Sequence, residues 1–228
     1  QLLSTLWFYA TGQFQMSDGD LIGLNQSTVS RIVHRISRCI AKSKSNFIKF
    51  PTNLQREKES FYVIAGFPSV VGAIDCTHVA ISTPGGGEVF RNRKGYYSIN
   101  VQAIRSFDRQ FTNVVVRWPG STHDSRIFEN SIIHDRFEND DINGMLLGDN
   151  GYACKGYLMT PLLNPSSDAE RRYNKSHIKT RSRIEQSFGV LKQRFRALRI
   201  PLRTKLDNSL VIIVAIFCLH NFAMTSRI

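Results

Sequence analysis

Two short apolar runs that each end in an aspartate constrain this chain more than any other feature. The first, VVGAID, covers residues 70–75 and ends in Asp75, and the second, MLLGD, covers 145–149 and ends in Asp149. Runs of this length and composition are typical of buried strands. We therefore expect two strands that bring carboxylates together at the edge of a sheet.

The residues between these runs predict more strands. HVAIS (78–82) alternates as a following strand would, and β-type runs at 96–107 and 111–120 surround the turn signal Asp108-Arg109. The natural result is a meander of three consecutive strands, with 145–149 as a fourth strand. This pattern predicts an α/β fold built on a mixed sheet.

Two helices are expected in the C-terminal part. Over 176–198, apolar residues recur at helical spacing and predict one buried seam. The seam consists of Ile184, Phe188, Leu191, Phe195 and Leu198. The stretch 210–219 is apolar throughout but shorter than the roughly 20 residues of a membrane span. We interpret it as a buried helix and expect no membrane association.

Residues 1–48 predict a small all-α region of helix-turn-helix type. LLSTLWFYA is apolar and helix-forming, SDGDLIGL begins with a capping signal, and Asn25 opens a longer basic helix. Arg31 and Arg35 lie off the apolar stripe of that helix, where DNA-contacting residues would lie. The alternative is a helical bundle that only packs on its neighbour. Residues 49–69 are interpreted as a polar linker.

The charge distribution favours an anionic partner. The formal net charge is +12, and residues 168–205 hold twelve basic and three acidic residues, whereas 124–149 hold two basic and seven acidic residues. A basic segment beside an acidic one suits a metal-dependent enzyme that acts on a polyanion. The alternative is a basic solvated face on an ordinary nuclear protein.

The cysteines and the chain ends set further limits. The four cysteines lie far apart without a CxxC pair, which excludes a zinc ribbon and a disulfide scaffold. The chain opens at Gln1 within a helical pattern and stops at Ile228 without a tail, so we expect it to be an excised piece of a longer protein.

The acids are of the kind that binds divalent metal ions. Hydrolysis or transfer of a phosphodiester needs charge neutralisation and an activated oxygen nucleophile, which two ions about 3.5–4 Å apart supply. Such hard cations prefer oxygen ligands, so carboxylates suit them better than His or Cys. Glu185 on the basic helix is a third candidate beside Asp75 and Asp149. An acid on a basic helix, however, commonly pairs with a cation one turn away, here Arg181.

Six motifs together resemble the PIF/Harbinger transposases and the Harbinger transposase-derived nucleases of animals. In chain order they are GAIDCTHVAI, FRNRKGYYSINVQAI, RWPGSTHDSRIF, LLGDNGY, RIEQSFGVLKQRFRAL and CLHNF. They extend in order over roughly residues 60–225. The resemblance implies an RNase H-like domain over 70–225, with a mixed sheet flanked by helices.

The same resemblance implies a DDE triad that binds two Mg²⁺ or Mn²⁺ ions and cleaves double-stranded DNA, with strand transfer as a further activity. The triad maps onto Asp75, Asp149 and Glu185, with 35 residues between the last two. Asp124 is the rival for the second position. We expect it in the first turn of a helix, as an additional candidate for the metal site.

The resemblance also implies partners and a compartment. Domesticated members of the family act with a separate Myb/SANT-like DNA-binding protein, so such a partner is expected here, and a homodimer is a further candidate. A DNA enzyme with unpaired cysteines fits the nucleus.

Further basic residues are candidates for DNA contact because they follow the glycine-rich loop at 84–87 or lie on the basic helix. They are Arg91, Arg93, Lys94, Arg181, Lys192 and Arg196. For the loop residues, a solvated edge is an equal alternative. His78 and His123 are expected near the acids as ordinary hydrogen-bonded histidines, with orienting a carboxylate or contacting a phosphate as the alternative.

Two other functions fit part of the pattern. A domesticated DNA-binding protein would keep the fold without the reaction, although the three acids are intact. An RNase H-type enzyme acting on RNA–DNA hybrids would share the carboxylates but would not explain the flanking motifs.

Overall fold

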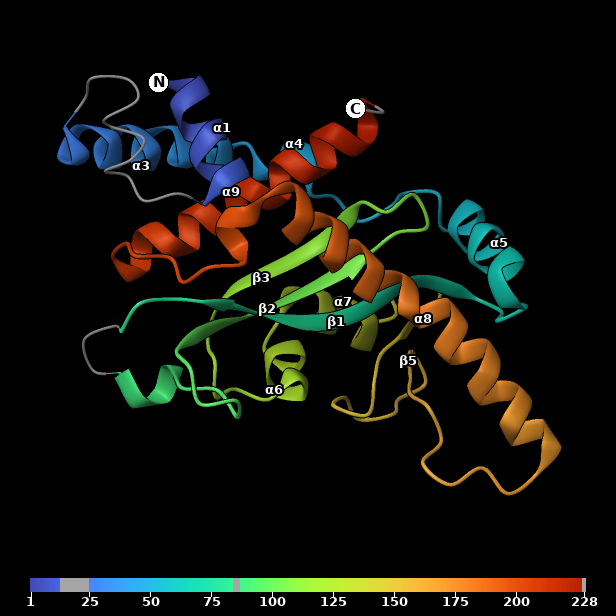
Figure 1. The fold of residues 1–228 in the computed structure, drawn as a ribbon. Helices are drawn as coiled ribbons and strands as arrows, with labels where there is room; N and C mark the ends of the chain where they lie inside the picture. Colours follow the sequence, from blue (N-terminus) through green and yellow to red (C-terminus); the bar gives the residue numbers. More distant parts are fainter. Residues whose placement is uncertain (13–24, 84–86, 227–228) are drawn as a thin grey trace.

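The computed structural model describes residues 1–12, 25–83 and 87–226. A five-stranded mixed sheet lies at its centre, with helices on both faces (Figure 1). The elements are α1 (Leu2–Thr11), α3 (Gln26–Lys42), α4 (Lys44–Phe47), α5 (Leu54–Ala65), β1 (Val70–Ala80), η1 (Gly87–Phe90), β2 (Ser98–Arg105), β3 (Phe111–Pro119), α6 (Asp124–Glu129), α7 (Ile132–Glu138), β4 (Met145–Leu147), β5 (Leu158–Met159), α8 (Asp168–Arg194), η2 (Arg196–Leu198) and α9 (Leu206–Thr225).

The strand order is β3-β2-β1-β4-β5. The pairs β1–β2 and β2–β3 are antiparallel, whereas β1–β4 and β4–β5 are parallel. The predicted three-strand meander and the fourth strand are therefore confirmed. With helices on both faces of this mixed sheet, the architecture is α/β and RNase H-like, as expected.

β1 differs from its prediction in length. The runs VVGAID and HVAIS were expected as separate segments, but residues 70–80 form one strand in which Asp75 pairs with Ala103 of β2. Asp75 therefore lies inside a strand and not at its end. The parallel pairing with β4 stops earlier, at Ala73 and Leu147. Asp75 and Asp149 each lie two residues beyond that last pair, so both acids lie where β1 and β4 are no longer paired.

Two apolar clusters fill the space above and below the sheet. On one face, α8 and α9 pack with the N-terminal helices over side chains such as Val79 and Val101. On the other face, α6 and α7 pack over Ile74 and Ile104 (Figure 1). The alternation of β1 and β2 residues between the faces is what makes both clusters possible.

α8 has the predicted buried seam, and all five seam residues are buried. The helix begins earlier than expected because Ser167 and Glu170 form a capping box that satisfies its first amide groups. It ends at Arg194, so Phe195 and Leu198 lie in the cap and the following 3₁₀ turn rather than in the helix. Their side chains still reach the core.

α9 is longer than the apolar stretch 210–219 that predicted it. At 20 residues it is long and apolar enough to cross a membrane by length and composition alone. In this structure it is a core helix, because Ile212, Ile213, Ile216 and Phe217 pack against the sheet and the N-terminal helices.

The N-terminal helices share the core of the sheet domain. Tyr9 of α1 and Val33 of α3 are fully or almost fully buried in the same cluster as the α8 seam. The Tyr9 hydroxyl lies 2.5 Å from Ser37 Oγ, which ties α1 to α3. The stretch SDGDLIGL, expected as the middle helix of a helix-turn-helix, lies outside the described residues.

The expectation of a polar linker over 49–69 missed a helix. α5 begins after Asn53, whose side chain caps the Arg56 amide, and ends at Gly66 in the left-handed conformation. Its buried Phe61 packs in a cluster with Val70 and Leu147 on the sheet. The segment is therefore part of the packed domain, although its charged sequence resembles a connection.

Candidate metal centre

Three carboxylates meet where the pairing between β1 and β4 ends. Asp75, Asp124 and Asp149 each offer an oxygen, and these three atoms all lie within 4.8 Å of one another. All three residues are half-buried. Glu185, the third acid of the expected triad, does not belong to this group in the described structure.

Local structure fixes the direction of two of these side chains. Asp149 Oδ1 accepts a 2.9 Å hydrogen bond from the Gly151 amide. Asp124 is the first residue of α6, and its Oδ1 accepts a 2.9 Å bond from Asn100 Nδ2, which also donates to the Thr122 carbonyl. Asn100 is almost fully buried in β2, so it holds Asp124 and the chain before α6 against the sheet.

The crowding of the three acids affects the pKa of Asp75. Burial, followed by the charges of Asp149 and Asp124, raises the pKa of Asp75 to about 7. The Cys76 amide, which donates to Asp75 Oδ1 at 2.8 Å, and Arg181 act in the opposite direction. Negative charge is therefore incompletely compensated here, and a cation bound among the carboxylates would relieve their repulsion.

Gly151 packs closely against the carboxylates. A Cβ atom on this residue would lie 2.9 Å from Asp149 Oδ1 and 3.4 Å from Asp124 Oδ2. A larger residue would therefore crowd two oxygens of the cluster. Oxygen donors and incomplete charge compensation together fit a hard divalent ion such as Mg²⁺ or Mn²⁺.

Arg181 links the cluster to Glu185. One guanidinium nitrogen lies 3.3 Å from Asp75 Oδ2 and another lies 2.6 Å from Glu185 Oε1. The alternative interpretation of Glu185, as the ion-pair partner of the base one turn earlier, is thus observed. Arg181, expected as a DNA contact, is instead engaged by two acids. Arg181 thus lies between Glu185 and the three aspartates. Glu185 itself is on the exposed side of α8.

Several cations gather beside the cluster, around His78. Lys192 of α8 donates a 2.9 Å hydrogen bond to the His78 carbonyl. The His78 ring nitrogen Nδ1 lies 3.0 Å from Ser98 Oγ. Its pKa is lowered by burial and then by Lys192, Arg93 and Lys94, against the charge of Asp124. His78 is therefore a hydrogen-bonded histidine, as expected, with basic side chains around it.

The remaining candidates for DNA contact lie elsewhere. Arg91 is paired with Glu88 at 3.0 Å and stacks on Tyr97. Arg196 is exposed in η2.

Arg31 and Arg35 are exposed on α3, which packs on α1 and α9 rather than on the cluster. The structure therefore does not bring these two arginines to the acidic site.

Sequence reasoning missed two residues of the site, Asn100 and Gly151. Asn100 is a polar residue inside the apolar run SINVQAI, and a buried polar side chain in a strand needs a hydrogen-bond partner. That pattern could have pointed to it. Gly151 stands in LLGDNGY two residues after Asp149, but its closeness to Asp124 depends on the tertiary fold.

Comparisons with known proteins agree with this geometry. Residues 74–221, well over half of the chain, match the family described as DDE superfamily endonuclease. The human protein named "Putative nuclease HARBI1" is 37% identical over 236 residues, covering 98% of this chain and 66% of that protein. The Xenopus laevis protein of the same name is 33% identical, covering 98% and 67%.

A plant relative is more distant. The Arabidopsis thaliana "Protein ALP1-like" is 28% identical, covering 89% of this chain and 55% of that protein. The chain thus spans just under two thirds of its human relative and little more than half of this plant relative. No solved structure matches it. The family match covers most of β1, the other four strands, the three aspartates and α8, and it confirms the resemblance inferred from the motifs. The chain belongs to the DDE superfamily endonucleases.

Proposed function

We propose that this chain cleaves phosphodiester bonds of double-stranded DNA with the help of divalent metal ions. The observation that carries the proposal is the meeting of Asp75, Asp124 and Asp149 where the pairing of β1 with β4 ends, with oxygens within 4.8 Å of one another. The family match to endonucleases and the relatives named as nucleases support it.

Asp75 and Asp149 are the proposed principal ligands, and Glu185 is the proposed third acid of the triad. Bound Mg²⁺ or Mn²⁺ would supply an activated water or DNA 3′-hydroxyl and would stabilise the leaving oxygen. Asp124 is the proposed additional ligand, oriented by Asn100. Arg181 forms ion pairs with both Asp75 and Glu185, so it keeps these two acids close to each other.

Basic side chains near the cluster are proposed to bind the DNA backbone. Arg93, Lys94 and Lys192 are close enough to His78 to lower its pKa, and Asp124 is close enough to raise it. Such contacts supply affinity without reading sequence. Arg196 and the exposed Arg31 and Arg35 are proposed as contacts outside the cleavage site.

The proposal extends to partners and compartment. We propose that the chain acts in the nucleus with a Myb/SANT-like DNA-binding protein, and that a homodimer is its working form. An Arabidopsis relative, 26% identical over 93% of this chain, is named for antagonism of a heterochromatin protein, which is consistent with a nuclear role. Size-exclusion chromatography with light scattering tests the dimer, and localisation of a fluorescent fusion tests the compartment.

Nicking of supercoiled plasmid in Mn²⁺ tests the reaction. We expect wild type to nick, Asp149→Asn to lose activity by about 100-fold or more, and EDTA to stop the reaction. Asp141→Asn is the matched control, because it removes an exposed aspartate away from the cluster. Asp149→Asn should bind a labelled duplex as wild type does, since the basic residues supply affinity.

Two results would overturn the proposal. Equal nicking by wild type and Asp149→Asn would mean a contaminating nuclease. Duplex binding by all variants without nicking in any metal, even with the partner protein added, would favour the alternative of a domesticated, catalytically silent DNA-binding protein.

The same assay separates Glu185 from Asp124. For Glu185→Gln we expect a loss comparable with that of Asp149→Asn. For Asp124→Asn we expect a smaller loss of about 10–100-fold, as for groups that support a metal site. The reverse order would assign Asp124 to the triad and leave Glu185 as the ion-pair partner of Arg181.

A further inference from the structure

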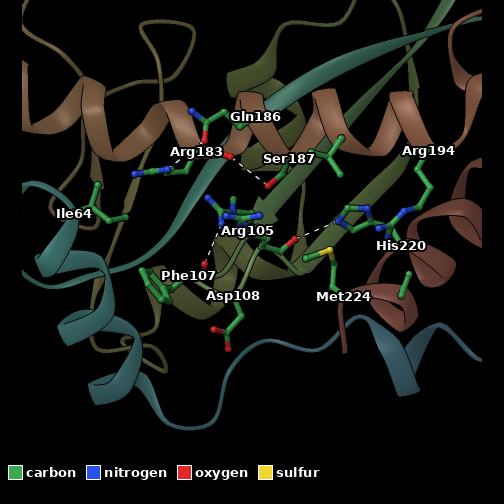
Figure 2. A pocket seen from close by; sticks show the side chains of 13 residues that line it. Ile64, Arg105, Phe107, Asp108, Arg183, Gln186, Ser187, Arg194, His220 and Met224 are labelled. Atoms are coloured by element: carbon green, nitrogen blue, oxygen red, sulfur yellow. Dashed lines mark hydrogen bonds between the residues drawn. The ribbon is translucent and has the colours of Figure 1, made fainter. Parts of the chain in front are cut away.

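A pocket of about 710 Å³ lies on the other flank of α8 from the three aspartates (Figure 2). The end of β2, the β2–β3 turn, α5, α8 and α9 all contribute to it. Along an α-helix each residue turns by about 100°, so Arg183, which lines the pocket, points about 200° away from Arg181, which contacts Asp75. The pocket is therefore separate from the candidate metal centre.

Four arginines line this pocket, and we call it the arginine pocket. They are Arg105, Arg109, Arg183 and Arg194. Asp108 is the acid among the lining residues, and it is paired with Arg56 at 3.8 Å. Glu57, buried nearby, accepts a 2.9 Å hydrogen bond from the Phe107 amide and offsets part of the positive charge.

Arg105 is the buried centre of this group. It is 3% exposed, and in the described part of the chain its Nε has no hydrogen-bond partner. Figure 2 shows it between Arg183 and Phe107, in the middle of the lining side chains. Burial, followed by the charges of Arg109 and Arg183, lowers its pKa to about 10. The guanidinium thus stays charged at neutral pH, with a donor that an anion would satisfy.

The pocket is also apolar over much of its wall. Phe107 and Val190 are 38% and 41% exposed, and Ile64 and Met224 complete this part of the lining. Arginines set beside exposed apolar side chains favour a ligand that carries both carboxylates and an apolar group, because each kind of contact is then matched.

We propose that the arginine pocket binds an acidic segment of a partner protein in which carboxylates flank an apolar side chain. Val63 of α5 and Phe222 of α9, which are neighbours in the chain of the lining residues Ile64 and Ala223, are further exposed apolar side chains. A peptide chain reaches such neighbouring surface, whereas a small anion would fill only the cavity. A DNA backbone would leave the apolar wall unmatched.

Fluorescence anisotropy with a labelled peptide tests this proposal. The probe carries Asp and Glu residues on both sides of a central Leu-Phe-Leu. Two control peptides replace either the acids by Asn and Gln or the apolar centre by Gly-Ser-Gly. We expect only the first peptide to bind, with an affinity that falls as salt rises.

Variants of α8 locate the binding. Arg183→Gln should weaken the peptide about tenfold, as expected for loss of one charge-assisted contact, and Val190→Asp should weaken it at least as much. Arg172→Gln is the matched control, because it removes the same charge from an exposed position of α8 outside the pocket. Circular dichroism on heating verifies that the variants fold.

The result of the peptide-binding experiment does not depend on whether the chain cleaves DNA. Arg183→Gln should nick plasmid and bind a labelled duplex as wild type does, whether or not the peptide binds. The proposal fails if the probe does not bind wild type at about 1 mM, if the Gly-Ser-Gly peptide binds equally well, or if Arg183→Gln binds the probe unchanged. A loss of duplex affinity in Arg183→Gln without peptide binding would assign the pocket to nucleic acid instead.

Discussion

The two flanks of α8 leave charge of opposite sign incompletely compensated. On one flank Asp75, Asp124 and Asp149 crowd together, with Arg181 as the cation in contact with Asp75. On the other flank four arginines surround a pocket where Arg105 is buried. Charges that are buried without full pairing cost stability. The proposed ligands, a cation on one side of the helix and an anion on the other, would offset this cost.

The buried seam of α8 lies between the two flanks, so a substitution in this seam is expected to affect both flanks. Phe188 is 6% exposed and stacks on Phe111, with ring centroids 5.5 Å apart. Phe188→Ala should lower the free energy of unfolding by about 3–5 kcal/mol, whereas the exposed control Gln193→Ala should change it by less than about 0.5 kcal/mol. Urea unfolding measures this. A Phe188→Ala variant of wild-type stability would contradict the shared seam.

Acid is expected to destabilise the arginine-pocket flank through His220. Burial, then Arg194 and Arg105, lowers the pKa of His220 to about 4, against its hydrogen bond to the Arg109 carbonyl. Between pH 6.5 and 4 the unfolded chain binds a proton that the folded chain excludes, so stability falls as the pH falls. The loss from this group approaches about 3 kcal/mol.

Urea unfolding at pH 7 and pH 4 checks this expectation. His220→Gln should lose less stability between the two pH values than wild type does. The same loss in His220→Gln and wild type would show that His220 titrates normally.

Manganese should act on the acidic flank alone. At a free ion concentration about 100 times the dissociation constant, binding stabilises the folded state by about 2.7 kcal/mol, which for a chain of this size raises Tm by about 5–10 °C. Asp149→Asn should lose most of this shift and Arg183→Gln should keep it. Differential scanning fluorimetry in Mn²⁺ and in EDTA measures it, and an equal shift in both variants would place the ion elsewhere.

The smallest expected effect concerns the helix that carries both flanks. Ser167→Ala removes the side chain that caps α8, which should cost about 1 kcal/mol. Nicking and peptide binding should both persist under conditions where the variant is folded. Thermal unfolding measures the cost. Loss of one activity alone would mean that the start of α8 takes part in that site.

Local patterns were read correctly where neighbouring residues decide the structure. The apolar spacing from Ile184 to Leu191 identified the buried side of α8, and the strand runs identified β2 and β3. α5 was missed because its charged residues at 56–59 hid the cap at Asn53 and the left-handed Gly66. Both capping residues are in the sequence, so this helix was predictable in principle.

Some residues of the candidate site were likewise predictable from the sequence, and others were not. Asp75 and Asp149 follow from apolar runs that each end in an acid, and the sequence by itself determines the helix face that carries Arg181 and Glu185. Asp124 reaches the cluster through the tertiary fold, in which Asn100, 24 residues earlier in β2, donates a hydrogen bond to it.

The arginine pocket was not predictable, because Arg105, Arg109, Arg183 and Arg194 come from segments far apart in the chain. Side-chain periodicity follows from the local geometry of a helix or strand, so the sequence determined which faces are apolar, acidic or basic. Which of these faces meet depends on strand order and on the packing of helices across the sheet, and only the tertiary structure decided that.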